Sequence, residues 1–180
     1  MAATYTVSAT GVTQSSSKNM IAISNATGSG KIVKIYRAWM TNVQTGAVSG
    51  GLGLYVPGRV TGSVHSSGTG VNFLPHANVL TAGTATPFTG ISAAHGATLG
   101  AFTHEFSRFV RSSDELAVSG ITTDEIIGII MPFCLVFDSG YGDTNVEPIT
   151  LRENQAFAIK ADATGTYNGT SDVFVELTIV

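Results

Sequence analysis

Residues 172–180 carry the pattern that most constrains the fold of this chain. One face of this run receives only aliphatic side chains, Val173, Val175, Leu177 and Ile179. The other face receives Phe174, Glu176, Thr178 and Val180. Side chains of a strand alternate between its faces, so this period of two predicts a strand with one fully buried side. Residues 149–160 read as strand, tight polar turn and strand, and we expect this end of the chain to lie inside a sheet, as suits a rigid building block.

Charged residues are scarce for a soluble domain. They make up 12% of the 180 residues, against about 25% in typical domains. The polar surface must then be built from Ser, Thr, Asn and Gly, which are less costly to desolvate than Lys or Glu and suit packing against other proteins. A Thr-rich outer face of a sheet would explain the same composition, because Thr favours strands.

The net charge, the single cysteine and the lengths of the apolar runs argue against nucleic-acid binding, disulfide formation and membrane insertion. The net charge is −3 and the one basic cluster is Lys31, Lys34 and Arg37, so we expect no nucleic-acid partner. The single cysteine, Cys134, excludes an intrachain disulfide and is predicted to be a buried small hydrophobe. Its apolar run, residues 126–137, is too short to span a bilayer, which needs about 20 residues. We expect a buried strand bent at Pro132, no membrane association, and no signal peptide in the first seven residues.

The first third of the chain predicts three strands. Residues 4–8 and 19–25 are separated by a polar segment, and a Gly-rich turn then leads into the longest candidate, residues 31–42. In strict alternation, one face of this candidate carries Val33, Ile35, Arg37 and Trp39. The other face carries Ile32, Lys34, Tyr36, Ala38 and Met40. Both faces are partly apolar, which is typical of a central strand.

The middle of the chain, residues 45–100, is rich in Gly, Ser, Thr and Pro and predicts short strands with long contact loops. The spacing of Phe102, Phe106 and Phe109, and capping boxes at 112–115 and 122–125, would allow a turn or two of helix. A strand over 101–106 fits the rest of the chain better. We therefore predict one all-β domain over 1–180, an antiparallel, jelly-roll-like β-sandwich with at most one or two short helical turns. Residues 1–18 could form an extended contact arm.

The segment 27–31 has a superficial likeness to a phosphate-binding loop. The Walker spacing requires a Gly where this chain has Asn25, and a Ser or Thr where it has Ile32. A strand is also expected after it, where the motif needs a helix. We predict a hairpin-type turn and no nucleotide cofactor.

No other motif predicts catalysis or metal binding. The four histidines, His65, His76, His95 and His104, show no metal-ligand spacing. Asp138, Asp143 and Glu147 could supply calcium ligands, but a polar turn between strands is favoured. The acidic pairs at 114–115 and 124–125 read as solvated turns, and no G-x-S-x-G elbow is present. We therefore expect no enzyme, no metal and no cofactor.

Three segments in this order resemble a family of small virion structural proteins of tailed bacteriophages and prophage regions. They are KIVKIYRAWMTN at 31–42, RVTG at 59–62 with GTGV at 68–71 and His76, and EPITLRENQAFAIK at 147–160. The resemblance implies a virion component, with capsid decoration or cement as the preferred role, and transfers no site residues. It implies a virion location after synthesis in the host cytoplasm, and partners among the major capsid protein or other virion proteins.

Roughly the last 35 residues are also similar to the final strands of trimeric tumour-necrosis-factor and C1q-like jelly rolls. This second resemblance implies a homo-oligomer, with a trimer favoured. For a decoration protein, the contact surfaces would be residues 45–100 and 1–18. The alternative is a carbohydrate- or receptor-binding head or tail-fibre module, with Tyr55, Phe73, Phe88 and Tyr141 as its aromatic platform. A hydrolase at Asp138 and Asp143 is the third hypothesis.

Overall fold

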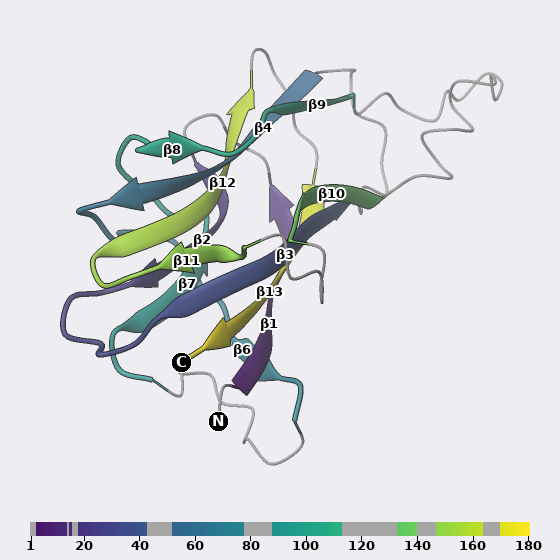
Figure 1. Cartoon of the computed structure of the whole chain (residues 1–180). Coiled ribbons are helices and arrows are strands. Elements are labelled where there is room, and N and C mark those ends of the chain that lie inside the picture. Colours follow the sequence, from purple (N-terminus) through teal and green to yellow (C-terminus); the bar gives the residue numbers. More distant parts are fainter. Residues whose placement is uncertain are drawn as a thin grey trace, which may run out of the picture.

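The computed structural model describes residues 3–13, 15, 18–42, 52–77, 88–112, 133–139, 147–163 and 170–180. In these ranges the chain forms antiparallel strands and no helix. The strands build two sheets that pack face to face (Figure 1). The prediction of an all-β, antiparallel sandwich is therefore confirmed.

Each sheet has a defined strand order. The first sheet runs β10 (Phe133–Asp138), β3 (Val33–Asn42), β13 (Thr170–Ile179), β1 (Ala3–Thr13) and β6 (Phe73–Pro75), and β11 (Ile149–Leu151) also pairs with β3. The second runs β5 (Thr69–Gly70), β7 (Ile91–His95), β2 (Asn19–Asn25), β12 (Gln155–Ala163), β4 (Leu52–Thr61) and β8 (His104–Glu105), and β9 (Phe109–Ser112) also pairs with β4.

The chain changes sheet at each step from β1 to β4 and from β5 to β7, then between β9 and β10, and again at each step from β11 to β13. The first long strand pairs with the last, and β2 pairs with β12. This nesting of early strands beside late ones is the double Greek key of a jelly roll.

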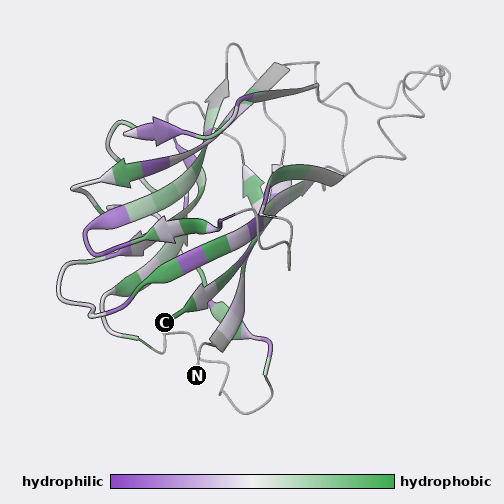
Figure 2. Cartoon of the chain, viewed as in Figure 1, coloured by the Kyte–Doolittle hydropathy of each residue, from purple (hydrophilic) through white to green (hydrophobic). Residues whose placement is uncertain are grey.

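The core lies between the sheets. On β13, Val173, Val175 and Leu177 are 0% exposed and Ile179 is 3% exposed, as the alternation predicts. The second sheet meets them with apolar residues that include Ile21, Ile23, Phe157 and Ile159. Figure 2 shows hydrophobic and hydrophilic positions alternating along β3, the interior strand that lies against β13.

Residues 149–160 form the predicted strand, turn and strand, but the two strands do not pair with each other. β11 joins the first sheet through β3, and β12 joins the second through β2 and β4. The polar turn therefore carries the chain from one sheet to the other. Asn154 in this turn has φ 59°, a left-handed conformation that Asn adopts more readily than most residues.

The predicted faces of β3 are wrong beyond Tyr36. Against β13, Arg37 is opposite Glu176 and Ile35 is opposite Leu177, so Tyr36 is an extra residue in the strand. One extra residue moves every following side chain to the other face. The buried set is accordingly Val33, Ile35, Ala38 and Met40. Trp39, predicted to share the face of Val33, lies on the opposite side of the sheet.

The N-terminal segment differs from the expected contact arm. β1 extends to Thr13, beyond the predicted end at residue 8, and lies between β13 and β6. Its register shifts between Ala9 and Val12, and Gly11 in this bulge has φ 62°. Tyr5, Val7, Ala9 and Val12 are buried. Residues 3–13 are thus a sheet strand that contributes to the core.

The loop-rich middle contains β4 to β7, while 43–51 and 78–87 lie outside the described residues. The alternative of a helix near Phe102 is not realised, since β8 and β9 are there. Both capping boxes extend into residues that are not described. The predicted buried strand 126–137 is described from β10 onward, where Val136 is buried but Leu135 is 47% exposed.

Candidate interaction surface

The outer face of the second sheet is covered by the chain itself. A row of small residues crosses five strands of this sheet, Gly70, Ala94, Ala22, Ala158 and Gly58. Leu99 and Phe102, from the segment between β7 and β8, pack against the alanines of this row. A Cβ atom added to Gly58 would collide with the ring of Phe102. The small side chains therefore make room for the covering segment.

A second loop is fixed on the same face. The backbone N–H of His65 donates to Ser24 Oγ at 2.9 Å, and His65 Nδ1 is 2.6 Å from the same oxygen. Ser66 and Thr98 exchange two backbone hydrogen bonds of 3.0 Å, which join this loop to the covering segment. Burial lowers the pKa of His65. The neutral ring is the form that fits, because its Nδ1 can accept the Ser24 hydroxyl proton.

The outer face of the first sheet carries an aromatic row. Trp39 on β3 has Leu135 of β10 on one side and Phe174 of β13 on the other, and Ser8 of β1 follows Phe174. The rings of Trp39 and Phe174 stack, with centroids 5.3 Å apart and an interplanar angle of 13°. Leu135 is 47% exposed. We call Leu135, Trp39 and Phe174 the aromatic row.

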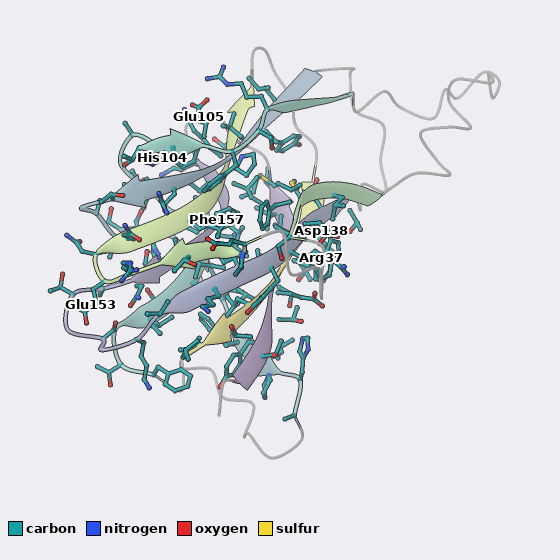
Figure 3. All side chains as sticks on the ribbon, viewed as in Figure 1. Arg37, His104, Glu105, Asp138, Glu153 and Phe157 are labelled. Atoms are coloured by element: carbon teal, nitrogen blue, oxygen red, sulfur yellow. The ribbon has the colours of Figure 1, made fainter. Side chains whose placement is uncertain are left out.

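A charged row lies directly beside the aromatic row. Asp138, Arg37 and Glu176 are neighbours across β10, β3 and β13, and Thr6 and Leu74 continue this line across β1 and β6. Arg37 and Asp138 form a salt bridge of 3.3 Å (Figure 3). Exposed ion pairs add little stability. This pair instead places two opposite charges beside the apolar aromatic row. A protein contact surface typically has such an apolar centre with a polar rim.

Most of the predicted aromatic platform is not on the surface. Tyr55 is 0% exposed and Phe73 is 2% exposed, both within the core. Phe88 packs edge-on against Tyr5, with the ammonium of Lys31 5.4 Å from its ring centroid. Tyr141 lies outside the described residues. Packing against the sandwich, not ligand stacking, accounts for the three described rings.

The Gly-rich turn at 27–31 holds an anion of its own chain. The carboxylate of Glu153 accepts the N–H groups of Gly28 at 3.0 Å and Gly30 at 2.8 Å. These backbone hydrogen bonds hold the pKa of Glu153 below its usual range. The buried side chain of Asn25 donates to Lys31 O and Leu151 O. The turn therefore links two connections between the sheets.

The histidines and carboxylates of interest are dispersed. His76 Nε2 is 2.7 Å from Thr6 Oγ1, and His104 Nδ1 is 3.5 Å from a guanidinium nitrogen of Arg59. Among the described residues, no three His, Cys, Asp or Glu side chains gather to hold a metal ion. Asp138 pairs with Arg37, whereas Asp143, both acidic pairs and the side chain of Cys134 lie outside the described set.

Sequence reasoning missed the aromatic row as a site. The alternation puts Phe174 on the same strand face as Glu176 and Thr178. An aromatic ring on this otherwise polar face is the signal that could have indicated an exposed aromatic site. Alternation groups Trp39 with Val33, Ile35 and Arg37, since the bulge at Tyr36 cannot be read from alternation.

The described segments contain no helix that could cross a membrane. Comparison with protein-family models, with curated protein sequences and with solved structures gave no match for this chain.

Proposed function

We propose that this chain is a non-enzymatic structural protein of a bacteriophage virion, and specifically a capsid decoration or cement protein. Its segment resemblance to virion proteins suggests the class, and the jelly-roll sandwich and low charge fit a building block. The observation that carries the proposal is the stacked Trp39–Phe174 pair beside exposed Leu135, on the outer face of the first sheet.

The aromatic row has the composition of an energetic centre of a protein interface. Trp is enriched among the few residues that dominate binding, and such residues are ringed by contacts that exclude water. The Arg37–Asp138 pair and the Ser and Thr side chains of the same face supply that ring with little net charge. A capsid partner is expected to bury this face, and binding only the folded chain would stabilise the assembly by mass action.

The test uses purified particles and the isolated chain. Mass spectrometry of native particles should detect the protein in many copies, and the wild-type chain should rebind particles from which it has been removed. Trp39→Ala should weaken rebinding about tenfold or more, the effect of losing roughly 1.4 kcal/mol or more at a hot spot. Phe106→Ala is the matched control, because Phe106 is a 40% exposed aromatic residue that follows β8 and is not part of the aromatic row.

Circular dichroism should show that both variants are folded. Particles that lack the protein, or equal rebinding by Trp39→Ala and wild type, would refute the proposal.

We further propose a homo-oligomer with a trimer favoured. Light scattering should then give three times the chain mass of 18.6 kDa, and a stable monomer would rule the trimer out.

A carbohydrate- or receptor-binding module remains the alternative. The ring of Trp39 would have to serve as its platform, yet Phe174 lies parallel to that ring and covers one of its faces. Binding on a glycan array that Trp39→Ala abolishes would favour this alternative over the structural role.

A further inference from the structure

Among the described residues, part of one edge of the first sheet has no partner strand. β6 pairs with β1 at Tyr5, Thr6 and Val7 and no further. Residues 70–72, which would continue that pairing, instead turn to the second sheet, where Gly70 pairs with Ala94 and Val71 N donates to Ala93 O at 2.9 Å. β1 therefore continues past Val7 along an open edge.

The backbone of Ser8 is directed at this open edge. His76 N donates to Thr4 O at 2.9 Å across the β6 side of β1. In an antiparallel strand, alternate residues direct both of their backbone groups to the same side. Thr6, opposite Leu74, and Ser8 therefore present their N–H and C=O groups to that side. Within the described part of the chain, no hydrogen bond joins the backbone of Ser8 to residues 70–72.

A groove of about 250 Å³ lies along this edge. Residues 8–10 of β1 form one wall, residues 70–72 form the other, and Leu74 and His95 also border the groove. A Cβ atom on Gly70 would meet no atom within 4 Å. None of the lining residues is Asp, Glu, Lys or Arg, so nothing in the groove calls for a charged ligand.

We propose that this groove accepts an extended, uncharged segment of a partner protein as an added strand beside β1. Strand addition to an open sheet edge obtains its affinity from backbone hydrogen bonds. The added segment would run antiparallel to β1 and take the line that residues 70–72 leave. Ser8 is the neighbour of Phe174, so the added strand would also extend the outer face that carries the aromatic row.

The bulge in β1 limits the length of the added strand. The register shifts between Ala9 and Val12, and the N–H of Gly11 already donates to Asp172 Oδ1 at 2.7 Å. Bulges bend a strand and blunt its edge. The recognised segment is therefore short, and its backbone bonds centre on Ser8.

The experiment titrates ¹⁵N-labelled protein with a capped decapeptide of alternating Thr and Val. The expected result is saturable binding, with the largest shifts at the amides of Ser8, Ala9 and residues 70–72. The same peptide with N-methyl groups on alternate residues, placed to face β1, should bind at least about tenfold more weakly, because it cannot donate to Ser8 O. Shifts elsewhere, equal binding of the methylated peptide, or no binding up to millimolar concentration would overturn the proposal.

Two variants localise the effect. Asn72→Trp should fill the groove and abolish binding, whereas Ser107→Trp adds the same ring at an exposed position outside it and should bind normally. If Asn72→Trp does not fold, Ser8→Pro serves instead. It removes the N–H that faces the groove, and proline is tolerated on an edge with that orientation. Trp39→Ala should leave peptide binding intact, so failure of the particle assay and failure of this proposal are distinguishable.

Discussion

Single polar side chains hold the connections of this sandwich in place. Glu153 bonds the Gly-rich turn, Asn25 reaches two backbone carbonyls, and Ser24 holds the loop of His65. These contacts cannot be read from the sequence, because apart from the Asn25–Lys31 bond each joins segments that are far apart in the chain. The composition alone indicated that Ser and Asn would carry the polar contacts of a weakly charged chain.

The carboxylate of Glu153 makes stability depend on acid pH. Backbone amides lower its folded pKa below the unfolded value, so its stabilising effect is present above that unfolded value, about 4.3. The effect is lost as the pH falls through the folded pKa. Glu153→Gln should lower Tm by a few degrees at pH 7 and reduce the fall in Tm between pH 5 and 3. Glu105→Gln is the control, because the Glu105 carboxylate pairs with Arg108. Identical acid profiles for wild type and Glu153→Gln would contradict the assignment.

His65 gives a dependence of the same sign in a higher pH range. Burial depresses its pKa in the folded state, so protonation favours unfolding. Its cost is absent above the unfolded pKa of about 6.5 and grows as the pH falls below it. His65→Gln should flatten the loss of Tm between pH 7.5 and 5. An NMR titration that gave His65 an ordinary pKa would refute this explanation.

At the scale of strands, alternation predicts a face well until a bulge intervenes. β13 follows its pattern along its whole length because its two neighbours impose no bulge on it. β3 changes face at Tyr36, where β13 advances one residue and β3 advances two. This bulge depends on the pairing of β3 with β13, which is far away in the sequence, so the local alternation of side chains gives no sign of it. The same reason explains why the strands at 149–160 were predicted but their membership of different sheets was not.

The covering of the second sheet gives a prediction at this scale. Gly58→Ala places a methyl group against the ring of Phe102. Overpacking of this kind costs about 1–3 kcal/mol. Urea unfolding should show that loss, and Phe102→Leu should recover part of it when combined with Gly58→Ala, because contacting residues are not additive. Full additivity of the two substitutions would show that they do not interact.

At the scale of the molecule, the sequence predicted the class of the fold, while the strand order and the exposed surface came from the structure. Strand-like runs separated by turns indicated an antiparallel sandwich. The aromatic row could not be predicted because the bulge in β3 changes the face of Trp39. The open edge of β1 depends on where residues 70–72 leave the first sheet for the second. Both surfaces are products of long-range pairing.

Pairing of the first long strand with the last also governs how the protein can be made. Ala3 meets Ile179 across the β1–β13 ladder, so the ladder joins opposite ends of the described chain. Closing so long a loop is slow, because its entropy is lost before any contact is gained. During synthesis, β1 and β3 each keep one edge unpaired until β13, the strand between them, has been made. The first sheet is therefore completed only when residues 170–180 have been synthesised. Until then its two halves have unpaired edges, and unpaired strand edges favour aggregation with other chains.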